Sequence, residues 1–488
     1  MTFPGTKKVF LMLALGLSLA SNSGLAEQPD YSNISNPFLG HAYMIYLQGD
    51  PLRAMAVDLV AEKQKRLGED SQLSQLFLAS NFAKLDLYEE AIKVYAGLVN
   101  QTNNSLDIRD TAWLEMAKLQ LETGQSAAAL AALTNIKLKL NGQEEADFNS
   151  AKARALLETG KVNEAVAALP KISDESIWAL YQSFNIGVKL IDQYRNKNGA
   201  LILHQISRLD NKDNGEIQAI QDQANLALGF SLLKINKPKQ ARAYLENVRL
   251  KSHLSNVALL GMGWSYSLEE NYEQALVFWL ELQNRPYRST YGYETMLAVP
   301  YALGKAKAFN QALQHYQAAQ QQISADIEDM NKAKEKINSN LFLTLISAAP
   351  DKETDWLANW INSPEAPESR FLPLLLDNPE FQATLMEYRA LLQLKNHILG
   401  LEKDINQLEE VFRTTSSDSE IANLHLRYQT VSQQTDKAMA HQLGLLRQQA
   451  LTTLSRYQAQ LNNYLEQIKF GIAQAIEGGT FKAEEGLQ

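Results

Sequence analysis

Apolar side chains of alternating size recur at a fixed spacing between residues 222 and 322. Three times, a position suited to a close helix crossing is followed twelve residues later by Ala, and a bulky apolar residue follows that Ala by four. Two helices that cross closely need small side chains at the crossing and large ones beside it. The spacing therefore predicts stacked helical hairpins, because no single hairpin buries its apolar face alone. The three copies contain Gly229, Ala241 and Leu245; Gly263, Ala275 and Trp279; and Pro300, Ala312 and Tyr316.

The same spacing extends toward the N-terminus as far as residue 38. Turn-forming residues interrupt the helical periodicity where a hairpin must reverse, at Gly49-Asp50, Thr123-Gly124, Thr159-Gly160 and Asn236-Lys237-Pro238. The sequence thus predicts about eight hairpins over residues 38–322. The Ala positions of the second helices are Ala54, Ala91, Ala129, Ala165, Ala200, Ala241, Ala275 and Ala312, with Ala200 one residue late.

One copy fills every signature position of a known repeat: Leu259, Met262, Gly263, Tyr266, Tyr272, Ala275, Trp279 and Leu282. These residues resemble the tetratricopeptide repeat family, whose unit is a pair of antiparallel helices of about 34 residues. The resemblance implies an all-α fold, a right-handed α-solenoid. Only the step from Ala241 to Ala275 has the family length, so the superhelix is expected to be irregular. Pro300 removes a backbone donor and is expected to kink its helix or begin a new one.

In this family the first helices line a concave groove, at positions three before and one and four after the small residue. A basic stripe is predicted there, from Lys84, Lys118, Arg154 and Lys234, beside an aromatic set of Phe184, Phe230, Trp264 and Tyr301, with Tyr293 further along. Aromatic rings suit binding anchors, and basic side chains suit a peptide carboxylate or acidic residues. The alternative is that the rings are ordinary core between neighbouring hairpins.

After residue 323 the small-residue spacing stops. Residues 324–336 are dense in charge and predict a solvated continuation of the last helix. Residues 323–376 are expected to form a helical connecting subdomain, in which Trp356 and Trp360 are packing residues.

From residue 377 to 478 the pattern predicts an antiparallel, coiled-coil-like hairpin of two long helices. Its packing onto the solenoid, occupation of the groove and dimerisation stay open. The first helix carries the apolar seam Ile398, Leu401, Ile405, Leu408 and Phe412, and the second carries Leu454, Tyr457, Leu461, Tyr464 and Ile468.

The two ends of the chain differ in character. Lys7 and Lys8 precede the apolar run Val9–Ala20, and Gly24 and Ala26 precede Glu27. This order is typical of a cleaved signal peptide over residues 1–26, followed by a linker over 27–37. A retained anchor is the alternative, although the run is shorter than the roughly 20 apolar residues of a spanning helix. Residues 479–488 are expected to form a flexible tail.

Composition excludes several classes of function. Cysteine is absent, which removes disulfides, thiolate metal sites and a lipid-bearing N-terminal Cys. Without Lys7 and Lys8, 44 basic residues face 55 acidic ones, a net charge of −11 that disfavours nucleic acid and anionic lipid. The seven His residues have no i, i+4 pair, so no metal site is expected. No phosphate-binding loop or nucleophile elbow is present in the sequence, and no catalytic residue or cofactor is expected.

The resemblance implies a scaffold or adaptor that binds a protein or peptide partner in its groove. The predicted leader places it in the periplasm of a bacterial cell envelope, and the lack of a catalytic motif predicts that it is not an enzyme. Two alternatives stay open. One is a structural component that self-assembles as a homo-oligomer through residues 381–476. The other is an assembly factor of an envelope or secretion complex, which rests on family analogy alone.

Overall fold

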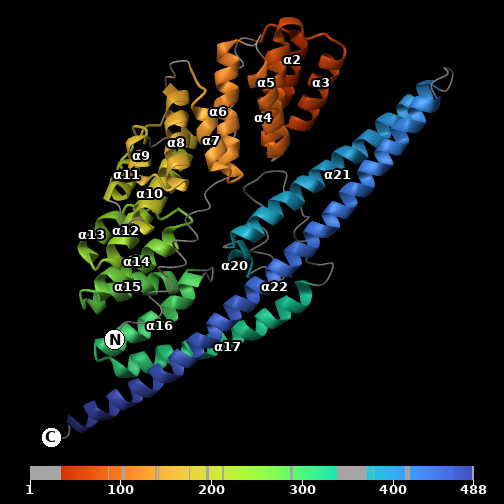
Figure 1. The fold of residues 1–488 in the computed structure, drawn as a ribbon. Coiled ribbons are helices and arrows are strands. Elements are labelled where there is room, and N and C mark those ends of the chain that lie inside the picture. The colour runs from red at the N-terminus through yellow and green to blue at the C-terminus, as the bar shows by residue number, and fades with distance from the viewer. Residues whose placement is uncertain are drawn as a thin grey trace. The chain divides into compact units, whose positions relative to one another are not determined.

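The computed structural model describes residues 34–337 and 371–485, apart from gaps at 86, 102–104, 138–139, 141, 175, 194–196, 211–213, 286–289, 377 and 413–417. The regular secondary structure of these residues is helical, and no strand occurs among them (Figure 1). The chain divides into two compact units, residues 1–255 and 256–488. The predicted signal peptide, most of the linker, and the tryptophans at 356 and 360 lie outside the described residues.

The described residues of unit 1 form a stack of six helical hairpins. Each first helix packs on its own second helix, and successive first helices from α4 to α12 also contact one another. The first helices are α2 (Pro37–Leu47), α4 (Ser71–Lys84), α6 (Leu106–Glu122), α8 (Gly142–Glu158), α10 (Ile177–Asp192) and α12 (Gly215–Lys234). The second helices are α3 (Pro51–Lys63), α5 (Tyr88–Asn100), α7 (Ser126–Leu133), α9 (Val162–Ala167), α11 (Lys197–Ser207) and α13 (Pro238–Leu245).

Unit 2 begins with two further hairpins and continues with a long helical pair. Its hairpins are α14 (Ser255–Ser267) with α15 (Tyr272–Gln283), and α16 (Thr290–Lys305) with α17 (Phe309–Ile337). They are followed by α20 (Leu372–Leu376), α21 (Pro379–Phe412) and α22 (Asp418–Glu485). The predicted all-α solenoid is confirmed, but the boundary between the units falls inside the predicted repeat region.

The small residues lie where the two helices of a hairpin touch. A Cβ atom added to Gly263 would come within 2.1 Å of Trp279 Nε1, and one added to Gly229 within 2.5 Å of Leu245 Cδ2. Trp279 has no room to withdraw, because it is fully buried and its indole donates to the Leu260 carbonyl at 3.3 Å. The predicted pairing of a small residue with a bulky one sixteen positions later is therefore the crossing contact itself.

One crossing differs from the sequence pattern. Ala200 is only partly buried, and Gly199 occupies the contact instead. A Cβ atom on Gly199 would meet the Gly187 carbonyl oxygen at 2.5 Å. The hairpin therefore keeps the twelve-residue spacing, and the late Ala200 was a wrong assignment.

The turns repeat one backbone conformation seven residues after the small position. Gly124 and Gly160 have φ of 75° and 82°, and Glu270 and Lys307 adopt the same left-handed region at 59° and 60°. The amide after each of these residues reaches back to a carbonyl of the preceding helix, as Ala308 does to Leu303 at 2.8 Å. This is the Schellman closure of a helix end. The predicted turns at Gly49, Gly124, Gly160 and Asn236 are confirmed.

A carboxylate seven residues before the small position ties each of two first helices to the loop that leaves its hairpin. Asp110 Oδ2 accepts from the Lys137 amide at 2.9 Å, and Asp222 Oδ1 accepts from the Arg249 amide at 3.1 Å. Both side chains are buried. The equivalent residue of α14, Asn256, accepts from the Arg285 side chain at 2.6 Å. The two carboxylates thus supply acceptors to backbone amides of the loops, whereas the Asn256 contact joins two side chains.

One prediction about α16 is narrowed, and one about α17 needs correction. The helix α16 runs through Pro300 to Lys305, so Pro300 does not begin a new helix. The charged continuation of α17 is not solvated all round, because Asp326, Met330, Ala333 and Ile337 form a buried face. Their spacing of three and four residues places them on one side of the helix, and that side packs with α22.

The predicted row on α22 is confirmed as a buried face. Leu454, Leu461 and Ile468 lie in one apolar cluster with residues of α16, α17, α20 and α21. Two glycines allow α22 to approach closely, since a Cβ atom on Gly471 or Gly478 would collide with Tyr316 or Phe309 of α17. Of the three arrangements left open for the hairpin, packing onto the last repeat is the one that α22 adopts within unit 2.

The helix α22 takes the place that the first helix of another hairpin would have. In α8, the residues six and three before the small position contact α10, since Ser176 donates to Asp147 and Ser150 donates to the Ala179 carbonyl. In α16 the same two positions are Glu294 and Leu297. The Tyr464 hydroxyl of α22 donates to Glu294 Oε2 at 2.7 Å, and Leu297 is buried in the cluster shared with α22.

The outer part of the long pair departs from the prediction. Ile398 is buried, but Leu401 is 54% exposed, so the seam on α21 does not stay covered along its length. The side chains of Leu408 and Phe412 lie outside the description. The helix α22 continues to Glu485, beyond residue 478, where the sequence pattern placed a flexible tail.

Replacing Gly263 by Ala is expected to destabilise unit 2 by about 1–3 kcal/mol, because the new methyl group overlaps an immobile Trp279. Gly97→Ala is the matched control, since Gly97 lies inside α5 with no atom near its Cβ position. That change should stabilise the chain by about 0.5–1 kcal/mol through helix propensity. Thermal unfolding of the two variants checks both signs. Equal effects would mean that the crossing is not the constraint.

Asp58→Asn is expected to stabilise unit 1 at pH 8 and to have little effect near pH 4. Asp58 is fully buried, and burial raises its pKa from 3.8 to about 6 although Ser74 donates to both carboxylate oxygens. A raised acid pKa favours folding below pH 3.8, and this contribution of at most about 3 kcal/mol is lost as the pH rises through 6. The measurement is the unfolding midpoint at pH 4 and 8, with the exposed Glu69→Gln as control. A gain that is the same at both pH values would contradict the assignment.

Candidate partner-binding face

The first helices of unit 1 present a common set of positions. Residues one and five after the small residue lie four apart and so share one face of their helix. We call these positions on α4, α6, α8, α10 and α12 the first-helix face. One after the small residue stand Ser80, Lys118, Arg154, Val188 and Phe230, and five after it stand Lys84, Glu122, Glu158, Asp192 and Lys234.

Lys118 is enclosed by acidic and aromatic side chains. Its ammonium lies 2.9 Å from Glu115 Oε1 and 3.0 Å from Asp147 Oδ2, and 5.0 Å from the Trp178 ring centre. Burial lowers the pKa of Lys118, but the two carboxylates outweigh burial and raise it. For Glu115 the effects have the opposite sign: burial raises the pKa of this carboxyl, and the nearby Lys118 only partly offsets the rise. With 2% of its surface exposed, Lys118 ties α6 to α8 and has no face left for a ligand.

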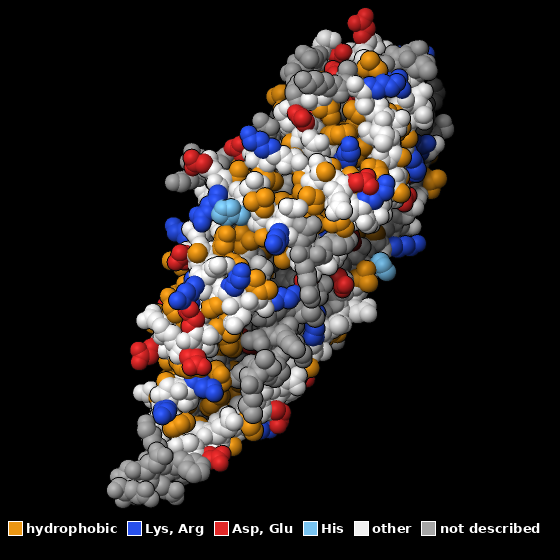
Figure 2. Space-filling model, turned by 60° about the vertical axis from the view of Figure 1, so that its left-hand side comes forward, with side chains coloured by type: hydrophobic (Ala, Val, Ile, Leu, Met, Phe, Trp, Pro, Cys, Tyr) orange, Lys and Arg blue, Asp and Glu red, His pale blue; other side chains and the backbone are white. Residues whose placement is uncertain are grey.

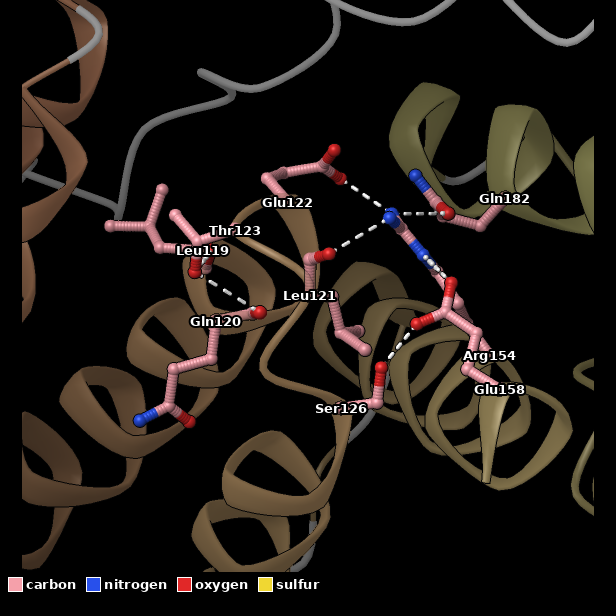
Figure 3. A network of polar contacts seen from close by, with 9 residues as sticks. All are labelled: Leu119, Gln120, Leu121, Glu122, Thr123, Ser126, Arg154, Glu158 and Gln182. Carbon is pink, nitrogen blue, oxygen red and sulfur yellow. Dashed lines mark hydrogen bonds and ion pairs between the residues drawn. The ribbon is translucent and has the colours of Figure 1, made fainter. Parts of the chain in front are cut away.

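Arg154 connects three consecutive first helices (Figure 3). From α8, its guanidinium donates to Glu122 Oε1 at 2.6 Å and the Leu121 carbonyl at 3.0 Å in α6, and to Gln182 Oε1 at 3.1 Å in α10. Within α8, Nε donates to Glu158 Oε1 at 3.0 Å. Glu158 also accepts from Ser126 of α7. Arg154 is half-buried, and the planar fork of a guanidinium suits such a bridge.

The positions five after the small residue are the accessible edge of the face, so Lys84 and Lys234 stand one residue beyond the predicted offset of four. Going from α4 to α12, they read Lys84, Glu122, Glu158, Asp192 and Lys234. Lys84 and Lys234 are exposed, and Lys234 Nζ lies 3.3 Å from Asp192 Oδ1. The edge therefore has three acidic residues in the middle and a lysine at each end.

Two of the four rings in the predicted aromatic set are buried and cannot line a groove. Phe184 is completely buried and Phe230 nearly so, and both pack in the solenoid core, as the alternative interpretation held. Trp264 and Tyr301 belong to unit 2 and are partly exposed. The Trp264 ring meets Trp279 edge-on at 5.0 Å, and the Tyr301 ring meets Tyr272 edge-on at 6.4 Å. Tyr293 is buried and donates to Asp326 Oδ2 at 3.0 Å.

The predicted basic stripe is largely neutralised. Lys118 and Arg154 each have two carboxylate partners, and Lys234 has one. These three cations thus face five carboxylates, a net charge of −2 (3 − 5). Figure 2 shows one face of the molecule, on which basic and acidic side chains are interspersed with hydrophobic ones. The prediction of a site that attracts acidic peptides through free lysines and arginines is therefore corrected. Three of its four cations are paired with carboxylates.

The acidic partners were missed in the sequence although they obey its register. Glu122 and Glu158 stand five after Ala117 and Ala153, next to the stripe positions. The available signal was that an acidic residue stands five after the small residue where a basic residue stands one after it. Stacked repeats that form ion pairs need charges of opposite sign at such fixed positions.

Other chemistry is not indicated by the described residues. No group of three or more His, Asp or Glu side chains among them is arranged to hold a metal ion. None of the helices described is both long and apolar enough to cross a membrane.

The described helices form an all-α solenoid of stacked hairpins. No protein-family description and no curated protein matches the sequence. Among solved structures, the apo form of RapI aligns over 75% of this chain and 98% of its own, at 15% identity and a TM-score of 0.36. The APC/C hetero-tetramer Cut9-Hcn1 aligns over 88% and 89%, at 13% identity and a TM-score of 0.23. A circular tandem repeat protein with a novel repeat topology aligns over 98% and 99%, at 13% identity and a TM-score of 0.12. At these scores the likenesses carry no conclusion about function.

Lys118→Met is expected to destabilise unit 1 by about 3–5 kcal/mol, because it leaves Glu115 and Asp147 buried without a counter-charge. Adding Glu115→Gln and Asp147→Asn to that variant should restore most of the loss. Lys234→Met is the control, with little effect because its ion pair is exposed. Amide hydrogen exchange of α6 and α8 checks the prediction. A single variant that exchanges like the parent chain would show that the network does not hold these helices together.

Proposed function

We propose that this chain is a protein–protein interaction scaffold of the cell envelope, without enzymatic activity, and that its first-helix face binds a peptide or helix of a protein partner. The observation that carries the proposal is the Arg154 bridge across α6, α8 and α10. It fixes the relative positions of three repeats, so a partner meets a face that is already ordered. Binding to a preorganised surface costs less conformational entropy than binding to a mobile one.

The charge order along the accessible edge describes the partner. Three acidic positions flanked by Lys84 and Lys234 suit an extended segment with a basic centre and acidic ends. Glu122 and Glu158 are already paired with Arg154. The edge therefore contributes to the choice of partner more than to the affinity for it.

The envelope location rests on the leader predicted at residues 1–26. A chain exported in this way would meet its partner in the periplasm. The competing idea, self-assembly through the whole α21–α22 pair, is less favoured, because the apolar row of α22 from Leu446 to Ile468 is already covered within unit 2.

Site-specific photo-crosslinking in living cells tests the proposal. A benzophenone amino acid is placed at Lys84 or Lys234 on the face, and at Lys93 or Leu201 as controls, which are exposed on the second helices α5 and α11. We expect both face positions to capture the same envelope protein and both control positions to capture none. Capture from all four positions, or from the controls alone, would reject the first-helix face as the binding surface.

A further inference from the structure

Two cations join successive first helices of unit 1 from one repeat position, the residue one after the small residue. Lys118 of α6 meets Asp147, which stands six before the small residue of α8. Arg154 of α8 meets Gln182, which stands five before the small residue of α10 (Figure 3). We call the positions five and six before the small residue the acceptor positions, because they receive the cation of the preceding first helix.

The next interface, between α10 and α12, has an acceptor but no cation at these positions. Val188 of α10 stands at the position of Lys118 and Arg154, and Gln223 of α12 stands at that of Asp147. The two helices are in contact, and Val188 packs against the apolar cluster that includes Ala224, the next residue after Gln223. The valine side chain has no hydrogen-bond donor, so it cannot replace the cation.

The carbonyl of the Gln223 side chain is buried without a hydrogen-bond donor. The residue is 9% exposed, and no described group donates to its Oε1 atom. Such a carbonyl has given up its bond to water and received none in return, which is unfavourable. Among the described buried side chains that lack a donor in this way, Gln223 is the one at an acceptor position.

A carboxylate stands at the accessible edge of the same interface. Asp192 lies four residues after Val188 in α10, as Glu158 lies four after Arg154 in α8. Arg154 Nε donates to Glu158 at 3.0 Å, whereas the described ion-pair partner of Asp192 is the exposed Lys234, at 3.3 Å. The Asp192 side chain is 44% exposed, so a cation can approach it from solvent.

These acceptors define the chemical class of the ligand. An ionised carboxylate only accepts hydrogen bonds, and the unpartnered atom of Gln223 is also an acceptor. Lysine and arginine carry several donors and a positive charge on a long apolar stem. Val188 is half-buried, so part of its surface is open to such a stem.

We propose that the interface between α10 and α12 receives a lysine or arginine side chain of the partner, which binds Asp192 and Gln223 beside Val188. The partner thus supplies the cation that Lys118 and Arg154 supply from within the chain at the two preceding interfaces. This inference rests on the proposed function, because it assigns the basic centre of the bound segment to one pair of first helices.

An arginine placed at residue 188 tests the acceptors in the absence of a partner. Val188→Arg should unfold at a temperature about 2–4 °C higher than Val188→Met, because arginine and methionine have similar helix propensity and only arginine can donate. The comparison is then repeated with Gln223→Leu in both chains, as a double-mutant cycle. The advantage of arginine should fall by about half, since one of its two acceptors is gone. Equal midpoints, or an advantage that Gln223→Leu leaves unchanged, would overturn the proposal.

Photo-crosslinking in living cells tests the site with the partner, using the benzophenone amino acid at Lys84. Val188→Arg should lower the yield of capture several-fold because its own guanidinium occupies the acceptors, whereas Val188→Met should leave the yield unchanged. Gln223→Leu, which adds no charge, should also lower it. Gln120→Leu is the matched control, since Gln120 has the same 9% exposure and an unpartnered carbonyl but stands outside the acceptor positions.

The outcomes separate this inference from the proposed function. Capture that is equal in the parent, Val188→Arg and Gln223→Leu chains would overturn the cation site and leave the first-helix face in place. Equal losses with Gln223→Leu and Gln120→Leu would also overturn it, because the effect would then not belong to the acceptor position. Absence of capture in the parent chain would reject the proposed function, and the cation site with it.

Discussion

The close crossing of the two helices in each hairpin is the constraint on which the rest of the structure depends. At Gly187, Gly229 and Gly263 the partner side chain stands where a Cβ atom would be. A hairpin that crosses this tightly has little freedom in its angle, because side chains in protein cores interlock at crystal-like density. The left-handed residue seven positions later, such as Gly124 or Glu270, then sets where the second helix begins. The loops between hairpins vary in length, but the geometry within each hairpin stays the same.

Fixed hairpins bring the same positions of successive first helices close together. Charged side chains at these positions are therefore close enough to form ion pairs with the neighbouring helix. A lysine or arginine one residue after the small position lies within hydrogen-bonding distance of the neighbouring helix. Lys118 and Arg154 both find carboxylates there. Lys118 is buried and Arg154 is half-buried, so leaving either cation unpaired would cost several kcal/mol. The ion pairs are thus a consequence of the crossing geometry, and they in turn fix the spacing between repeats.

The sequence predicted the architecture well because the crossing contact is local. Gly263, Ala275 and Trp279 lie within seventeen residues of each other, and their sizes alone reveal the contact. The candidate site was predicted less well because its state depends on neighbours that are remote in sequence. Phe230 and Lys118 occupy the same repeat position, and only the packing of the adjacent hairpins shows that one is core and the other is neutralised. Likewise, nothing local in α22 reveals that Tyr464 finds its acceptor in Glu294, which stands 170 residues earlier.

The role of α22 follows from the same constraint. A stack of hairpins always leaves the last one with an uncovered side, and an uncovered side invites end-to-end association. Here Glu294 and Leu297 of the last hairpin are covered by α22 at the positions that α10 covers in α8. The buried Glu294 has a raised pKa because burial disfavours its charge, and the Tyr464 hydroxyl partly offsets this. A polar pair in this position makes the docking of α22 specific, since a shifted helix would leave a carboxylate buried without a donor. Once α22 is anchored at that end, its N-terminal part extends beyond the last repeat, and no described side chain of α22 before Thr435 is buried.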